Sequence, residues 1–153
     1  MNAKPTIYFD LDGTLYDLYH VPNWLARITV LSDVSTYADE NATLVDMVHL
    51  HTILYALIDA GYSIGVVSWL AKNGNKEYNA AVRKTKREWI SKFLPMATEI
   101  HVVKYGTPKH RIINHRDDAI IVDDDASVRD AWKHGLTIDA TNDILTQLER
   151  LVN

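Results

Sequence analysis

The sequence contains no cysteine, and it has only six glycines, four prolines and two phenylalanines among its 153 residues. The absence of cysteine excludes disulfide bonds, thiolate metal ligands and cysteine nucleophiles. No apolar run approaches the length of a membrane span, and the polar start of the chain does not have the character of a signal peptide. We therefore expect a cytoplasmic protein without a membrane partner.

The composition is that of an ordinary globular domain. Hydrophobic residues make up 47% of the chain and charged residues 24%, with a formal net charge of −4 at pH 7. A mildly acidic protein is not drawn to nucleic acid or to anionic membranes by its charge alone. We find no internal repeat, low-complexity tract or linker, and a chain of this length can bury a substantial core. Residues 1–153 are therefore expected to form a single domain.

Short apolar runs alternate with segments of helical periodicity. In the helix expected over residues 44–58, the residues that recur at three- and four-residue steps are Leu44, Met47, Val48, His51, Leu54, Tyr55 and Ile58. Strands this apolar, separated by helices, indicate a parallel sheet covered on both faces. We therefore predict a doubly wound, Rossmann-like α/β fold with strands at residues 6–9, 64–67, 100–103, 119–122 and 136–138.

Acidic residues follow two of the expected strands directly. Asp10 and Asp12 come after the first strand, and Asp123, Asp124 and Asp125 come at the end of the fourth. Aspartate is common in turns, so each of these residues, taken alone, could be an ordinary turn residue without a functional role. Open α/β sheets, however, bind ligands at the carboxyl ends of their strands, where carboxylates from two strands repel each other unless a cation lies between them. Oxygen ligands without His or Cys favour a hard ion, and Mg²⁺ is the expected cofactor.

The segment FDLDGTL at residues 9–15 resembles the first motif of the haloacid dehalogenase (HAD) superfamily of phosphohydrolases. Three later features are similar to the remaining motifs, in the right order: the strand end at Ser68, the lysine Lys109 at the start of a short helix, and the pair Asp123-Asp124. The resemblance extends over residues 5–140 and implies a HAD core.

The resemblance also implies roles for these residues. Asp10 would be the nucleophile that forms an aspartyl-phosphate, and Asp12 the general acid and base. Mg²⁺ would be bound by the Asp10 carboxylate and the Asp12 backbone carbonyl, with Asp124 as a further ligand supported by Asp123. The register among Asp123, Asp124 and Asp125 stays open by one residue.

The remaining roles concern the phosphate group. Ser68 is expected to donate a hydrogen bond to a phosphate oxygen, and Lys109 to neutralise charge, with Lys104 as the competing lysine. Thr14 is expected to help hold the phosphate or the turn. Trp69 either lines the pocket or packs in the core.

Little room exists for a substrate-selecting cap. Residues 15–40, called the flap below, can hold one short helix around residues 24–28, so the cap is minimal or absent and the site fairly open. Open sites suit nucleic-acid ends or phosphoproteins, or need a neighbouring subunit as a lid. Ser68-Trp69 followed by the basic segment 86–90 is similar to the 5'(3')-deoxyribonucleotidase branch, which implies (deoxy)nucleotide monophosphates instead.

The leading interpretation is a Mg²⁺-dependent phosphomonoester hydrolase. The alternatives are a HAD phosphotransferase, a catalytically silent HAD-fold binding protein and a receiver-like module, although a receiver carries its acceptor aspartate alone on a middle strand. The lysines and arginines of residues 72–92 are interpreted mainly as a solvated helix face, with attraction of a nucleotide as the alternative.

Overall fold

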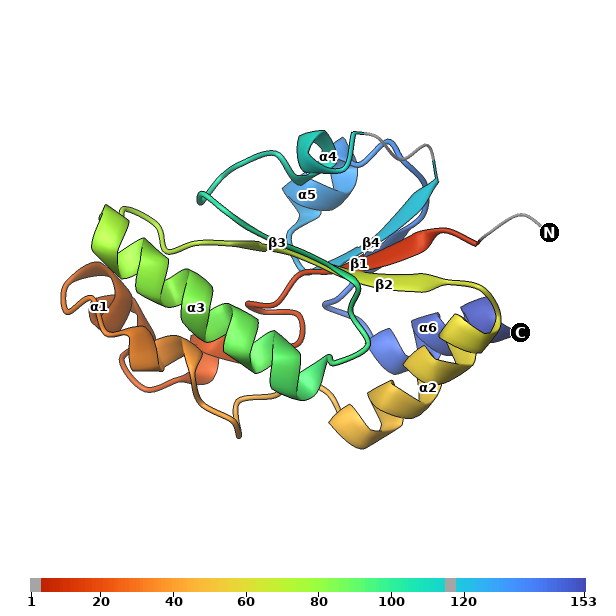
Figure 1. Ribbon diagram of the computed structural model, residues 1–153, viewed down its shortest axis with the longest axis horizontal. Helices are drawn as coiled ribbons and strands as arrows, with labels where there is room; N and C mark the ends of the chain where they lie inside the picture. The colour runs from red at the N-terminus through yellow and green to blue at the C-terminus, as the bar shows by residue number, and fades with distance from the viewer. Residues whose placement is uncertain (1–3, 115–117) are drawn as a thin grey trace.

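A computed structural model describes residues 4–114 and 118–153 of the chain. Its centre is a sheet of five strands in the order β3-β2-β1-β4-β5, and all four pairs of neighbours are parallel (Figure 1). The strands are β1 (Thr6–Phe9), β2 (Ser63–Trp69), β3 (Glu99–Val103), β4 (Ala119–Asp123) and β5 (Thr137–Asp139). The predicted α/β, Rossmann-like architecture is confirmed, with the last strand displaced by one residue. Among the described residues, no helix has the length and apolarity that crossing a membrane requires.

The central strands are buried on both faces, and alternate residues feed two separate cores. Ile7 and Phe9 of β1 belong to the larger core, whereas Tyr8 between them belongs to the smaller one. Successive side chains of a strand point to opposite faces of the sheet, so one apolar run supplies both cores. This double burial is the reason why the strands are continuous hydrophobic runs in the sequence.

Helices cover each face of this sheet. The larger core receives apolar residues from α2 (Met47–Asp59), α3 (Lys76–Phe93) and α6 (Ile144–Val152). The smaller core is covered by α4 (Lys109–Ile112) and α5 (Ala126–Ala131). Figure 1 shows α4 and α5 on one side of the sheet and α2 and α6 on the other. The arrangement leaves the carboxyl ends of the strands available for a site.

Helix α2 buries only part of the face that its sequence indicated. The helix begins after Asp46, whose side chain accepts a hydrogen bond from the backbone of His49, so Leu44 lies outside it. Val48 is 79% exposed and Tyr55 is 51% exposed. The expectation that Leu44, Val48 and Tyr55 lie on the core face is therefore wrong, whereas Leu54 is buried and Met47 and Ile58 pack against the core as expected. The buried residues are Leu50, Ile53, Leu54 and Leu57.

The flap contains more structure than one short helix. It holds η1 (Leu18–His20), α1 (Trp24–Thr29) and η2 (Val34–Tyr37), and η2 packs against α3. The two ends of the flap are joined by backbone hydrogen bonds, from Asp17 N to Ala42 O at 2.9 Å and from Leu44 N to Leu15 O at 2.9 Å. The flap is therefore a closed loop that leaves the core immediately after the first acidic segment and returns at the same point.

Candidate functional site

The two acidic segments meet at the carboxyl edge of the sheet. Strands β1 and β4 are neighbours, and Asp10 N donates a hydrogen bond to Val122 O at 3.0 Å. One carboxylate oxygen from each of Asp10, Asp123 and Asp124 lies within 4.8 Å of the others, and such a group could hold a metal ion. All three donors are carboxylate oxygens, a set that suits a hard divalent cation. The predicted convergence of the two segments is thus present in the structure.

Burial and the repulsion between neighbouring carboxylates disfavour the ionised forms of Asp123 and Asp124. Burial, followed by the charge of Asp10, raises the pKa of Asp123 to about 6. The same two causes, with the charge of Asp123 added, raise the pKa of Asp124 to about 8. Without a cation, the group therefore retains protons near neutral pH. A divalent ion would displace them and relieve the repulsion.

Lys109 is the lysine that belongs to this site. Its Nζ donates to Asp10 Oδ1 at 2.9 Å and to Asp123 Oδ2 at 2.7 Å, and it lies 5.0 Å from the centre of the Trp69 ring. Burial acts to lower the pKa of Lys109, but the charges of Asp10 and Asp123 outweigh it and raise the pKa above its ordinary range. Lys104, the competing residue, is exposed. The structure therefore places Lys109, and not Lys104, against the carboxylates.

A tight turn brings Thr14 back to Asp10. The hydroxyl of Thr14 is buried and donates to Asp10 Oδ2 at 2.8 Å. Gly13 makes this turn possible because it has a φ of +82°, and a Cβ at this position would lie 2.3 Å from Asp124 Oδ2. Both oxygens of Asp10 are thus held, one by Lys109 and one by Thr14.

Asp12 is held by a second buried lysine. Lys86 Nζ donates to Asp12 Oδ2 at 2.6 Å, to Ser68 Oγ at 2.8 Å and to Trp69 O at 2.6 Å. The side chain of Lys86 is only 2% exposed. A single ammonium group thus connects the carboxylate of the first acidic segment with the end of β2.

The sequence interpretation missed Lys86, because it assigned the basic residues of α3 mainly to a solvated face. For Lys86 this assignment is wrong. A signal was available: Lys86 follows Val82 by four residues and precedes Trp89 by three, and both neighbours are buried. Residues at these spacings share one face of a helix, so the periodicity places Lys86 with the core.

The other predicted residues lie in different environments. Ser68 is fully buried and its hydroxyl accepts from Lys86, so its donation to a phosphate stays a prediction. Trp69 lines the pocket, and its Nε1 donates to Thr107 O at 2.9 Å. The carboxylate of Asp125 accepts hydrogen bonds from the hydroxyl of Ser127 and from its backbone N–H at the start of α5, and these bonds lower the pKa of Asp125. Asp123 and Asp124 are therefore better placed than Asp125 to face the metal position.

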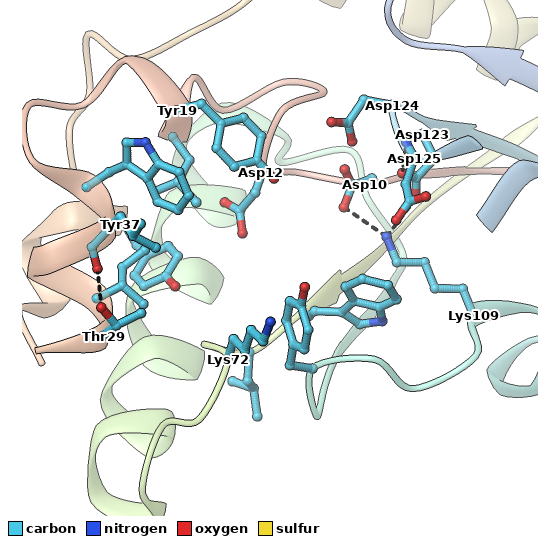
Figure 2. A pocket seen from close by; sticks show the side chains of 17 residues that line it. Asp10, Asp12, Tyr19, Thr29, Tyr37, Lys72, Lys109, Asp123, Asp124 and Asp125 are labelled. Atoms are coloured by element: carbon cyan, nitrogen blue, oxygen red, sulfur yellow. Dashed lines mark hydrogen bonds and ion pairs between the residues drawn. The ribbon is translucent and has the colours of Figure 1, made fainter. Parts of the chain in front are cut away.

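A cavity of about 410 Å³ opens in front of the acidic group. Figure 2 shows Asp10, Asp123, Asp124 and Lys109 at one end of this cavity, with Tyr37 of the flap at the other end and Tyr19 of the flap between them. The flap therefore covers more of the site than the sequence indicated. The apolar and aromatic lining residues are Leu18, Tyr19, Trp24, Leu25, Ile28, Tyr37, Trp69, Leu70 and Tyr105.

Comparison with known proteins finds no family model and no curated protein that match this sequence. The fold and the site define a class in structural terms: an α/β protein whose parallel sheet carries, at its carboxyl edge, three carboxylates able to hold a metal ion and a lysine bonded to two of them. The functional argument therefore depends on the chemistry of these residues.

Proposed function

We propose that this chain is a Mg²⁺-dependent phosphomonoester hydrolase of the HAD type, which works through an aspartyl-phosphate at Asp10. The observation that carries the proposal is the placement of the Asp10 carboxylate. It faces a cavity, is held by Lys109 and Thr14, and lies within 4.8 Å of two further carboxylates. Phosphoryl transfer requires mainly that a protein position the nucleophile and neutralise charge, and a carboxylate fixed beside a cation position meets both requirements.

The metal position draws on the same residues. Asp10, Asp124 and the backbone carbonyl of Asp12 would hold Mg²⁺, with Asp123 in support. When bound, the ion neutralises charge so that an anionic carboxylate can approach an anionic phosphate. Lys109, at the start of α4, contributes a second positive charge. Its hydrogen bonds to Asp10 and Asp123 keep both carboxylates in place.

The protein residues then perform two displacement steps. In the first, a carboxylate oxygen of Asp10 forms a bond to phosphorus while the bond to the leaving oxygen breaks, and Asp12 donates a proton to that oxygen. In the second, Asp12 accepts a proton from a water molecule that attacks phosphorus, and the bond to Asp10 breaks to release phosphate. Burial raises the pKa of Asp12 above its ordinary value despite the charge of Lys86, which supports its role as the acid.

The walls of the cavity favour a substrate with a planar group. The rings of Tyr19 and Trp24 are 5.0 Å apart, and those of Trp69 and Tyr105 are 5.1 Å apart on the other side. Aromatic faces of this kind stack on nucleobases, and the volume lies in the range typical of small-molecule pockets. We therefore propose (deoxy)nucleotide monophosphates as substrates in preference to phosphoproteins or nucleic-acid ends.

The decisive experiment measures phosphate release by the purified protein. With Mg²⁺ present, we expect hydrolysis of p-nitrophenyl phosphate and, in a panel with sugar phosphates and phosphorylated DNA ends, preference for mononucleotides. EDTA and Asp10→Asn should each abolish turnover, whereas Asp130→Asn, at an exposed aspartate of α5, should retain it. Full activity of Asp10→Asn would refute the mechanism. A receiver-like module would take up phosphate once, and a silent binding protein would release none.

A further inference from the structure

We propose that Lys86 is a positioning residue for this reaction. It holds one carboxylate oxygen of Asp12 and the hydroxyl of Ser68, so that the other Asp12 oxygen is presented to the leaving group. The inference rests on the proposed function, because it concerns the residue to which we assign the proton transfers. Figure 2 shows the Asp12 carboxylate reaching into the cavity.

The hydrogen bonds of Lys86 use its whole donor capacity. An ammonium group has three protons, and three acceptors lie within 2.8 Å of Nζ: Asp12 Oδ2, Ser68 Oγ and Trp69 O. Lys86 is not among the residues that line the cavity. It therefore has no proton left for a substrate and no surface on which to contact one. Any effect of Lys86 on the reaction must pass through the groups that it contacts, and Asp12 is the one among them to which we assign the proton transfers.

The position of Lys86 also connects three separate parts of the chain. It lies on α3, it bonds Asp12 after β1 and Ser68 in β2, and its Nζ is 4.9 Å from the centre of the Tyr37 ring in the flap. Tyr37 lines the cavity. The same ammonium group thus holds the Asp12 side chain and faces the wall that encloses the substrate.

A purely stabilising role is a weak explanation for such a contact. A buried ion pair adds little net stability, because desolvation of the two charges offsets most of their attraction. The geometric effect is direct, in contrast. With Oδ2 fixed by Lys86, the Asp12 carboxylate cannot rotate freely, and a proton donor must be held in register with the oxygen that it protonates.

The test compares two substrates that differ in their need for a proton. A simple alkyl phosphate has a poor leaving group, whereas 2,4-dinitrophenyl phosphate leaves without protonation. General acid catalysis contributes about 10²–10⁴-fold, so we expect Lys86→Met to lower kcat/KM by at least about 10²-fold for the alkyl ester and by less than about 10-fold for the dinitrophenyl ester. Lys84→Met, on the same helix with a side chain that is 80% exposed, is the matched control and should change neither value.

A double variant separates positioning from damage to the fold. In an Asp12→Asn background the proton donor is already lost, so Lys86→Met should cause little further loss, as non-additivity predicts for residues that act as a unit. Equal losses on both substrates, or full additivity with Asp12→Asn, would overturn the proposal. Should Lys86→Met fold poorly by circular dichroism, Lys86→Gln, which keeps hydrogen-bond donors without the charge, undergoes the same comparison.

A crystal structure of Lys86→Met provides a readout that does not depend on turnover. We expect the Asp12 carboxylate in a different rotamer, and an unchanged Asp12 would contradict the proposal even in an active enzyme. Absence of hydrolysis by the unmodified protein, together with a displaced Asp12 in the variant, would instead reject the proposed function and leave Lys86 as the residue that positions Asp12.

Discussion

Replacement of Lys109 by methionine removes the one ammonium group that bonds both Asp10 and Asp123. The side chains involved are almost entirely buried, with exposures of 2% for Lys109, 9% for Asp10 and 1% for Asp123. In the metal-free variant, two buried carboxylates face each other without a counter-charge. Loss of one partner from a buried ion pair costs about 3–5 kcal/mol. We expect a loss of this size in the free energy of unfolding at pH 8.

Proton uptake makes this loss depend on pH. Burial and the charge of Asp10 already raise the pKa of Asp123 to about 6. Without Lys109 the pKa of Asp123 should rise further, so at pH 5 this carboxyl is neutral in the variant and the repulsion is largely removed. The difference between variant and unmodified protein should therefore be smaller at pH 5 than at pH 8.

Urea unfolding in EDTA, followed by the fluorescence of the four tryptophans, measures the effect. With a denaturant slope of about 1–3 kcal/mol per M, the midpoint of Lys109→Met should fall by about 1 M or more at pH 8. Lys104→Met alters an exposed lysine and should stay within about 0.5 kcal/mol of the unmodified protein. A loss below about 1 kcal/mol for Lys109→Met, or equal losses for the two variants, would refute the reasoning.

Three further predictions follow from the same site. The metal-free protein should lose stability as pH rises from 4 to 8. The reason is that the pKa of Asp124 is raised from 3.8 to about 8, so that the folded state binds more protons than the unfolded chain across that window. In thermal unfolding, the increase in Tm on addition of Mg²⁺ should be largest at the upper end of this range. Gly13→Ala should abolish the effect of Mg²⁺ on Tm, because the added Cβ would lie 2.3 Å from Asp124 Oδ2. Gly106→Ala is the control, because Gly106 has the same φ of +82° and a Cβ there would have nothing within 4 Å. This control should cost about 1–2 kcal/mol of stability and retain the Mg²⁺ effect. Tyr19→Leu should raise KM about 10-fold for a nucleotide, as expected for loss of a stacking face, with little change for a small sugar phosphate; Tyr55→Leu, at an exposed residue of α2, is the control.

The fold and the acidic group could be predicted because both depend on short stretches of sequence. The runs at β1 and β4 are almost entirely apolar, and each ends directly in aspartates, so strand, orientation and ligand edge follow from one pattern. The sequence predicted this shared edge but not the strand order, and it is the parallel pairing of β1 with β4 in the structure that brings Asp10 next to Asp123. Lys109 was favoured over Lys104 because a lysine in the helix that follows β3 fits the pattern of the HAD superfamily that the sequence resembles.

Contacts that depend on helix rotation and loop packing were not predictable in this way. Helix α2 carries apolar residues all around its surface, so the exposed Val48 and Tyr55 could not be told from the buried Leu54 by spacing alone. Lys86 was hidden in a basic segment, although its spacing from Val82 and Trp89 placed it with the core. The walls that the flap contributes to the cavity depend on contacts among its own short helices and with α3.

The stem of the flap has a consequence for how this protein can change. Leu15, Asp17, Ala42 and Leu44 pair through their backbones at its base. The chain between them starts and finishes at one place, so its length and composition can alter while β1 and Asp10 stay where they are. In the proposed reaction, the wall that the flap contributes to the cavity is thereby separate in the chain from Lys109 and the aspartates proposed to handle the phosphate. Under that proposal, exchange of this single loop would alter one wall of the cavity and leave the acidic group in place.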